Sequence, residues 1–335
     1  MGDRTAAAAY AAGWRLVREL PEKPGRAAFR SMADTAWRRR GPGVLRLEAN
    51  LRRVAGPGVT APQLRALSRA GMRSYLRYYY EMFRLPAIDA ATLDARTRAT
   101  GVEALEAHVR SGRGVVAALP HMGNWDHAGA WITLRGVPLT TVAERLRPPE
   151  VFDRFVDFRT GLGMEVLPLT PAEDAAGAAG ASGAGIAGRL ARRLREGRLV
   201  CLLADRDLTA GGVDVEFFGE AARMPAGPAA LAERTGAALM PVSLWYDGPL
   251  LRIEVHDEIP VPDLADRRDR VRAMTQGLAG VFQDRIAEHP EDWHMLQRVF
   301  TADLAAPPPG AYAPEAAPPA DSVDAAAGGG VGQGR

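Results

Sequence analysis

Between residues 113 and 260 the chain repeatedly passes from a short apolar run to a stretch of helical character, and this alternation limits the possible folds more than any other feature. The expected strands are residues 114–119, 138–143, 164–169, 199–204, 213–218, 239–244 and 251–255. Expected helices are residues 150–160, 186–196 and 225–236, followed by a closing amphipathic helix at 266–289. Strands that alternate with helices predict an α/β fold with a mostly parallel central sheet covered by helices.

The residues that precede this region predict helices alone. We expect a helix over 5–20 that ends at Pro21 and Pro24, a helical region over 26–55 and a helix over 62–83. These segments are rich in arginine and aromatic residues, notably Arg38, Arg39, Arg40, Tyr75, Tyr78, Tyr79 and Tyr80. Two interpretations stay open. The helices could have one core face and one solvated face, or some of them could lie on an anionic membrane surface, with arginines at the headgroups and aromatic rings at the interface.

Two segments lack the bulky apolar residues of a packed core. Residues 172–188 are mostly alanine and glycine and predict a flexible loop. Residues 305–335 are rich in proline, alanine and glycine and predict a disordered tail. We therefore expect a single domain over 1–304, with a helical, membrane-docking portion at 5–83 and an α/β catalytic portion at 113–260.

Composition excludes several classes of protein. The 42 basic and 40 acidic residues give a net charge of +2, which provides no overall field to attract nucleic acid, and no nucleic-acid partner is expected. The one cysteine, Cys201, lies in an apolar run, so we expect a core thiol rather than a nucleophile or a disulfide. No apolar run reaches 18 residues and no signal peptide is evident, which predicts a cytoplasmic protein without a membrane-spanning helix.

The sequence Pro-His-Met-Gly-Asn-Trp-Asp at 120–126 directly follows the first expected strand. Ligands of open α/β sheets bind at the carboxyl ends of the strands, so His121 is well placed for catalysis. An imidazole can accept a proton from a hydroxyl near neutral pH, and a carboxylate such as Asp126 could fix its tautomer. The plainer interpretation is a loop histidine followed by an acid in the first turn of a helix. His121, Asp126 and His127 could also be metal ligands, but no second cluster has ligand spacing, and no metal is expected.

Further charged residues follow later strands and helices. Asp205, Arg206 and Asp207 come directly after the run 199–204 and could lie beside His121, or could form a charged turn. Arg223 precedes an expected helix whose N-terminus suits an anion such as a phosphate, although a simple helix entry by proline explains the same residues. Arg159 lies between a helix and a strand and could bind a phosphate or be solvated.

Taken in order, these motifs resemble those of the bacterial lysophospholipid acyltransferases of the lipid A biosynthesis type. The resemblance covers about residues 10–303. It rests on Pro-His-Met-Gly-Asn-Trp-Asp at 120–126, Asp-Arg-Asp at 205–207, Val-Glu-Phe-Phe-Gly at 215–219, Met-Pro-Ala-Gly-Pro at 224–228 and His-Pro-Glu-Asp-Trp-His-Met-Leu-Gln at 289–297. The opening residues 10–15 and the ending 291–297 are most similar to the actinobacterial branch of this family, the phosphatidylinositol mannoside acyltransferases.

The resemblance implies an O-acyltransferase that uses acyl-CoA, with palmitoyl-CoA as the donor. The acceptor would be the 6-hydroxyl of the 2-linked mannose of a phosphatidylinositol mannoside. In this family the motif histidine is the general base, which implies that role for His121, with support from Asp126. A further acid completes a relay in the mannoside branch, and Asp205, or next Asp207, is our candidate.

The resemblance also implies ligand contacts and a location. Arg159 would help to place the ligand, and Arg206, Asp207 and Arg223 would contact substrate. Acyl transfer from a thioester needs no metal and no cofactor beyond the acyl-CoA co-substrate. The protein would lie peripherally on the cytoplasmic face of the cell membrane. Two alternatives stay open: an enzyme of the same family with another lipid acceptor, and a catalytically silent membrane-binding protein that keeps the fold.

Overall fold

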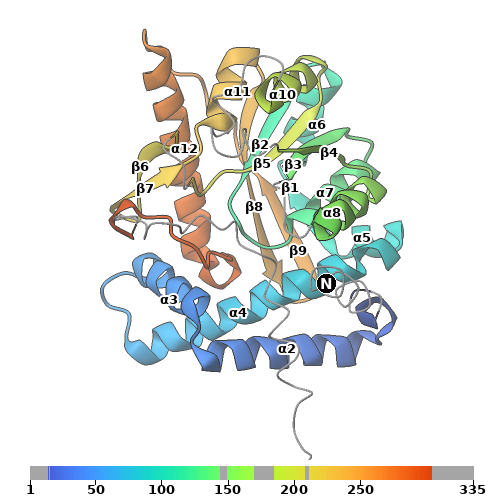
Figure 1. The fold of residues 1–335 in the computed structure, drawn as a ribbon. Coiled ribbons are helices and arrows are strands. Elements are labelled where there is room, and N and C mark those ends of the chain that lie inside the picture. The colour runs from blue at the N-terminus through green and yellow to red at the C-terminus, as the bar shows by residue number, and fades with distance from the viewer. Residues whose placement is uncertain (1–13, 15, 144–148, 170–184, 208–210, 304–335) are drawn as a thin grey trace, which may run out of the picture.

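The computed structural model describes residue 14 and residues 16–143, 149–169, 185–207 and 211–303. Its centre is a seven-stranded sheet with the strand order β1-β9-β8-β2-β5-β3-β4 (Figure 1). The strands are β1 (Thr97–Thr100), β2 (Val115–Leu119), β3 (Leu139–Ala143), β4 (Glu165–Pro168), β5 (Leu199–Leu203), β8 (Ala238–Asp247) and β9 (Leu250–Val255). All neighbouring pairs are parallel except β8 and β9. The predicted α/β fold with a mostly parallel sheet is confirmed.

The apolar run at 213–218 has a different place from the other six. Its strand, β6 (Val213–Phe217), leaves the central sheet and pairs antiparallel with β7 (Glu220–Met224). Phe218 and Gly219 join the two strands with φ angles of 52° and 73°. Two successive positive φ angles are typical of the tight turns that close β-hairpins, so this run belongs to a separate hairpin.

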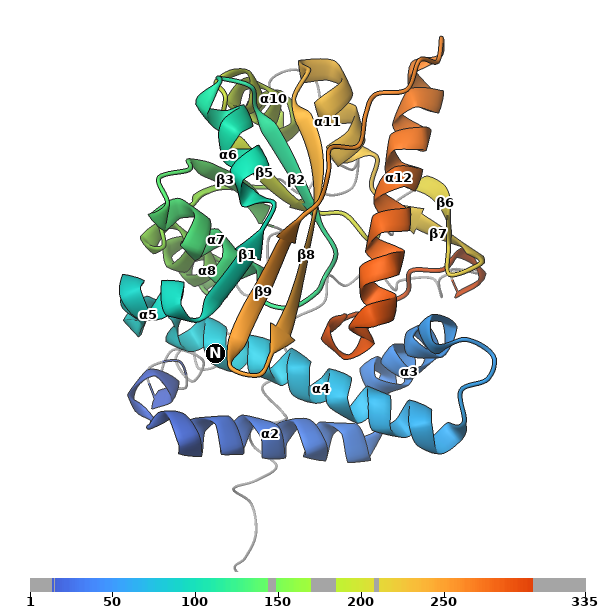
Figure 2. The ribbon, with the colours of Figure 1, turned by 180° about the vertical axis from the view of Figure 1, so that it is seen from behind.

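Helices cover both faces of the sheet (Figures 1 and 2). They are α5 (Ala90–Ala95), α6 (Val102–Arg110), α7 (Trp125–Leu134), α8 (Pro149–Gly161), α10 (Ile186–Arg195), α11 (Gly227–Thr235) and α12 (Arg267–Glu288). Successive side chains of a strand point to opposite faces. Val116 and Val200 therefore belong to a core shared with α10, α11 and α12, whereas Ala117 and Leu199 belong to one shared with α6, α7 and α8.

The N-terminal helices form a separate layer. Helices α2 (Glu22–Arg39), α3 (Pro42–Ala55) and α4 (Ala61–Arg84) lie together at one end of the sheet (Figures 1 and 2). The region expected at 26–55 is thus two helices, because Arg40 has a left-handed backbone and Pro42 starts α3. Pro24 lies in the first turn of α2 and does not end a helix, since the first turn needs no N–H donor there.

The tyrosines of α4 correct part of the membrane interpretation. Tyr78 is 4% exposed and Tyr80 is 2% exposed, so neither ring lies at an outer interface. Arg38, Arg39 and Arg40 are exposed at the end of α2. Docking of this layer on a membrane stays a prediction. None of the helices in the described parts of the chain is long and apolar enough to cross a bilayer.

Three expectations fall largely outside the described residues. Of the helix expected at 5–20, the structure describes residue 14 and residues 16–20. Of the loop expected at 172–188, only residues 185–188 are described, and α10 begins at Ile186, as predicted. The tail expected at 305–335 is not described.

Candidate active site

His121 lies two residues beyond the end of β2, in a short loop that leads into α7. Asn124 caps α7, and its side chain accepts a hydrogen bond of 3.0 Å from the backbone N–H of His127. Gly123 has a φ of +60°, and a Cβ atom there would lie 2.8 Å from the backbone of Leu244. Only glycine fits such a position, so the strand, the glycine and the cap together fix the loop that carries His121.

Asp205 is the acid that contacts His121. The register of the parallel strands pairs Leu119 of β2 with Leu203 of β5, so the residues two further along each strand also lie side by side. Nδ1 of His121 lies 2.5 Å from Oδ1 of Asp205. The backbone N–H of His121 donates a 2.9 Å hydrogen bond to Oδ2.

The environment of Asp205 determines its charge and the tautomer of His121. Asp205 is fully buried, and burial alone would raise the pKa of its carboxyl. The charge of His121 and the hydrogen bonds from His121 and from the Trp293 indole outweigh this effect and lower the pKa. An ionised carboxylate can only accept hydrogen bonds, so Nδ1 of His121 carries the proton. The lone pair of the neutral ring is then on Nε2, which is the atom that can take a proton from a substrate.

Asp126 has other partners. Nε and Nη2 of Arg159 donate hydrogen bonds of 2.7 and 3.3 Å to its two carboxylate oxygens, and the Tyr78 hydroxyl donates one of 2.8 Å. Burial lowers the pKa of Arg159, but its pairing with Asp126 outweighs this and raises the pKa above its usual value. The expectation that Asp126 holds the His121 ring is therefore corrected: Asp205 contacts the ring, and Asp126 anchors Arg159.

An apolar cavity of about 420 Å³ opens beside these residues. Alternate side chains of three neighbouring strands form its floor: Ala117 and Leu119 of β2, Leu199, Cys201 and Leu203 of β5, and Leu139, Thr141 and Ala143 of β3. Along β5 it spans about 13 Å, at about 3.3 Å per residue. Polar groups of His121, Asp126, Arg159 and Arg206 join the lining. This combination of a long apolar lining and a few convergent polar groups suits an aliphatic chain with a reactive polar end.

Cys201 faces this cavity from the middle of β5. Burial raises the pKa of its thiol to about 12, so the thiol stays protonated near neutral pH. A protonated thiol is a poor nucleophile, in agreement with the expectation of a non-catalytic cysteine.

The other predicted site residues are not all brought together. Arg206 lines the cavity. Arg223 and Asp207 do not line it. The guanidinium of Arg223 lies 3.0 Å from Asp214 across the β6–β7 hairpin, and the backbone carbonyl of Arg223 accepts the N–H of Asp207 at 2.9 Å. Substrate contacts by these two residues stay predictions.

The three residues considered as metal ligands have separate partners in the structure. His127 contacts Thr97, with 2.8 Å between Nε2 and Oγ1, whereas His121 contacts Asp205 and Asp126 contacts Arg159. Burial lowers the pKa of His127 to about 4. Among the residues that the structure describes, no group of three or more His, Cys, Asp or Glu side chains could hold a metal ion.

Two contributors to the site had no role assigned from the sequence. In the sequence, Tyr78 belongs to a cluster of tyrosines and Trp293 to the motif 289–297, but neither pattern says what the polar atom of the side chain would contact. Trp293 donates a 2.9 Å hydrogen bond from Nε1 to Oδ2 of Asp205. A polar aromatic residue in an apolar context is the signal that each will find a buried partner.

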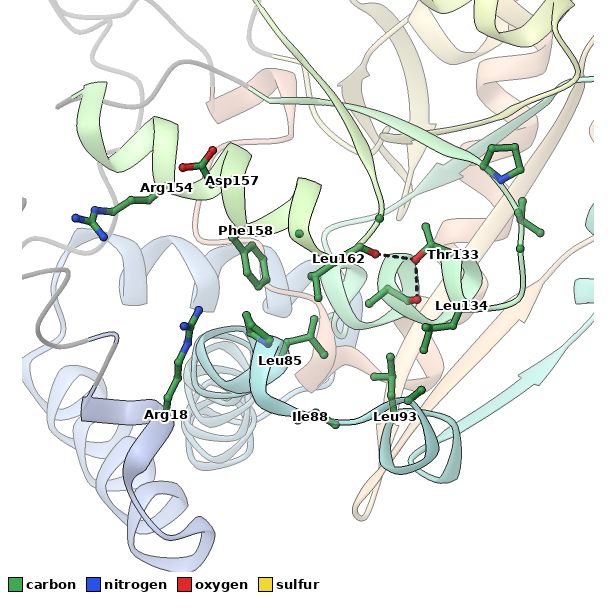
Figure 3. Close-up of a pocket in the computed structure, with 18 of the residues that line it drawn as sticks. Arg18, Leu85, Ile88, Leu93, Thr133, Leu134, Arg154, Asp157, Phe158 and Leu162 are labelled. Atoms are coloured by element: carbon green, nitrogen blue, oxygen red, sulfur yellow. Dashed lines mark hydrogen bonds between the residues drawn. The ribbon is translucent and has the colours of Figure 1, made fainter.

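A second, open groove of about 990 Å³ is lined by residues of α5, α7 and α8 (Figure 3). Arg18 and Arg154 stand near one end, and Leu85, Leu93 and Phe158 contribute to its wall. It contains none of the predicted site residues. The cavity next to His121 is therefore the candidate active site.

Comparison with known proteins defines the class of this one. The model of the bacterial lipid A biosynthesis acyltransferase family matches residues 3–302, and the chain belongs to that family. It is thus an acyltransferase, as the sequence motifs predicted.

The comparison also finds nearer relatives within this class. The chain is 46% identical over 305 residues to the phosphatidylinositol mannoside acyltransferase of Mycolicibacterium smegmatis. The aligned residues make up 91% of this chain and 94% of that protein. It is likewise 46% identical over 299 residues to the phosphatidylinositol mannoside acyltransferase of Mycobacterium tuberculosis strain H37Rv, with 88% and 89% of the two chains covered.

Proposed function

We propose that this protein transfers a palmitoyl chain from palmitoyl-CoA to the 6-hydroxyl of the 2-linked mannose of phosphatidylinositol mannosides. The observation that carries the proposal is the His121–Asp205 pair at an apolar cavity in a chain that is 46% identical to enzymes with this acceptor in their name. The pair supplies a base, and the cavity supplies a place for an aliphatic chain.

The reaction follows from the tautomer of His121. Nδ1–H donates to Asp205, so Nε2 takes the proton from the mannose hydroxyl while that oxygen attacks the thioester carbonyl. A C–O bond forms, a tetrahedral intermediate collapses, and the C–S bond breaks. The proton on Nε2 then passes to the leaving sulfur and restores the neutral ring. Asp205 remains ionised and stabilises the imidazolium in between.

The remaining polar residues would bind and place the two substrates. Arg159, held by Asp126, presents a guanidinium in a fixed position to the cavity. Arg206 offers a second cation on the lining for the phosphates of CoA or of the acceptor lipid. The acyl chain would lie along β2, β5 and β3, where the lining is almost entirely apolar.

We further propose that the enzyme works as a peripheral protein on the cytoplasmic face of the membrane. Support comes from the exposed arginines at the end of α2 and from exposed Met32 and Leu45 on the same layer of helices. Cations next to exposed apolar side chains suit an anionic lipid surface. Sedimentation with anionic but not with neutral vesicles is the expected result, and equal sedimentation with both would contradict it.

The acceptor is tested by product analysis. Purified protein is given palmitoyl-CoA together with phosphatidylinositol mannoside, phosphatidylinositol or a lysophospholipid, and the lipids are analysed by mass spectrometry. We expect the mass of the mannoside to increase by one palmitoyl group, on the mannose. Acylation of the lysophospholipid alone would favour another acceptor within the family. Vesicle binding without acylation of any of the three lipids would favour a silent membrane-binding protein.

A further inference from the structure

The segment from Asp292 to His294 lies directly against the loop that carries His121. The backbone N–H of Gly123 donates a 3.0 Å hydrogen bond to the carbonyl of Asp292, and the N–H of His294 donates one of 2.7 Å to the carbonyl of His121. Between them, Met122 and Trp293 form an antiparallel bridge. Three consecutive residues of the catalytic loop are therefore fixed by a segment that is about 170 positions away along the chain.

The side chain of Trp293 reaches past this bridge to Asp205. The indole is fully buried and packs against Phe217, with 5.9 Å between ring centroids. Its Nε1–H and the backbone N–H of His121 both donate to Oδ2 of Asp205, each at 2.9 Å. Two donors on Oδ2 prevent the carboxylate from rotating and leave Oδ1 for Nδ1 of His121. These two hydrogen bonds hold the plane of the carboxylate in one orientation toward the ring of His121.

A serine of α4 holds the same segment from the other side. Oγ of Ser74 contacts the carboxylate of Asp292 and lies 2.9 Å from Nε2 of His294. Oδ2 of Asp292 also accepts the backbone N–H of Tyr246 at 2.8 Å. All three side chains of this cluster are buried.

The protons of this cluster can be assigned. Burial lowers the pKa of His294 to about 3, so its ring is neutral. When Asp292 is ionised, the Ser74 hydroxyl donates to it and accepts from Nε2–H of His294. Nδ1 of His294 is then an unprotonated acceptor, and it is buried without a hydrogen-bond partner. Burying an acceptor without a partner costs less free energy than burying a donor without one. The hydrogen bonds therefore run in one direction, from His294 to Ser74 to Asp292.

We propose that residues 292–294 act as a clasp for the catalytic base, in which Trp293 is a positioning residue for Asp205 and Ser74 fastens the clasp to α4. The inference rests on the proposed role of His121. It assigns a function to the motif at 289–297 that the reaction itself does not use.

The test is Trp293→Phe, which keeps an aromatic ring and removes the N–H. We expect kcat to fall about 10- to 100-fold, the effect of one hydrogen bond to a charged group, with little change in the KM for palmitoyl-CoA. The carboxylate becomes more basic without this donor, so the acidic limb of the pH profile of kcat/KM should move to higher pH. A loss of packing alone would not move that limb.

The matched control is Trp37→Phe. It removes an indole that donates a 3.0 Å hydrogen bond to Ser68 in the N-terminal layer, away from the His121 cavity. We expect an unchanged pH profile for this variant. A Trp293→Phe enzyme with a wild-type profile and kcat would overturn the clasp, as would a fall in kcat without movement of the limb.

A second pair of variants tests the clasp if the Trp293→Phe protein does not fold. Ser74→Ala removes one hydroxyl, and Ser74→Thr retains it. We expect a lower kcat in the alanine variant and recovery in the threonine variant. Equal kcat values for wild type and Ser74→Ala would contradict the fastening role.

A readout independent of turnover separates this proposal from the proposed function. The Nδ1 proton of His121 should give a low-field proton NMR resonance that is absent in His121→Ala and shifted in Trp293→Phe. Turnover that survives His121→Ala would remove the proposed base, and the clasp with it. Loss of turnover in His121→Ala beside an unshifted resonance in Trp293→Phe would remove the clasp alone.

Discussion

At the scale of single residues, the chemistry of the site depends on which nitrogen of His121 is free. Asp205 occupies Nδ1, at 2.5 Å, and this leaves Nε2 for the substrate hydroxyl. Asp126 is 2% exposed and is engaged with Arg159 and Tyr78, so it cannot share this task without breaking a buried ion pair. The two acids therefore have separate roles, one in orienting the base and one in anchoring a cation.

Asp205→Asn should inactivate the enzyme without unfolding it. The amide can donate to Nδ1 of His121, which stabilises the wrong tautomer and places the proton on Nε2. We expect kcat to fall on the order of 10³- to 10⁴-fold, as for such a change in a catalytic triad, with KM little altered. Steady-state kinetics measures this. The exposed, remote Asp269→Asn serves as the control, and wild-type kcat in Asp205→Asn would contradict the assigned tautomer.

The sequence placed His121 at the site and offered Asp205 among several acids that could meet its ring. Residues 114–126 run from an expected strand through a proline and a histidine to the start of a helix. This order indicates a reactive residue at the edge of a sheet. Three acids, Asp126, Asp205 and Asp207, were compatible with the ring, because spacing along the chain does not give the register between β2 and β5. That register pairs Leu119 with Leu203, and it alone brings Asp205 beside His121.

At the scale of secondary-structure elements, one face of α4 holds the site together. Ser74, Tyr78 and Glu81 follow the spacing of helix neighbours. Ser74 contacts Asp292 and His294. Tyr78 contacts Asp126, and Glu81 contacts Asn124, the residue that caps α7. The helix that the sequence offered for membrane contact through its tyrosines therefore has an inner face committed to the active site. Periodicity predicted this helix well but could not say which face is buried.

The strands provide the cavity floor, so a strand substitution should alter the choice of acyl chain. Cys201→Phe places a ring in the middle of the apolar lining. We expect kcat/KM for palmitoyl-CoA to fall at least about tenfold relative to octanoyl-CoA, because the longer chain no longer fits past β5. Competition between the two donors measures the ratio. Retained octanoyl transfer reports a folded enzyme, and an unchanged ratio would place the acyl chain elsewhere.

At the scale of the whole molecule, the fold was predictable because most apolar runs are buried strands with clear flanking helices. The strands that were not predicted correctly are polar or short. β1 and β7 carry arginine and small residues instead of a continuous apolar run. The run at 213–218 resembles a strand of the central sheet, but its exposed and buried residues alternate and it forms a hairpin strand. Pairing order depends on contacts between distant segments, such as β1 with β9, and no local pattern contains it.

Acid should destabilise the fold partly through His127. Burial holds the pKa of His127 at about 4, below its ordinary 6.5. As pH falls through 6.5 the unfolded chain takes up a proton that the folded chain refuses until about pH 4, so stability present above 6.5 is lost in that window. We expect this to cost about 2 kcal/mol at pH 5.

Urea unfolding of wild type and His127→Gln at pH 7 and pH 5 measures this contribution. The variant lacks the titrating group, so its free energy of unfolding should fall less than that of wild type by about the same 2 kcal/mol. Parallel losses in the two proteins would show that His127 takes up its proton equally in the folded and unfolded chain.

The role of His121 is tested by the release of CoA thiol from palmitoyl-CoA, measured with and without phosphatidylinositol mannoside in wild type and in His121→Ala. We predict release that requires the mannoside and that falls at least about 100-fold in the variant, the loss expected on removing a general base. Mannoside-dependent release that His121→Ala leaves unchanged would contradict the assignment of His121 as the base.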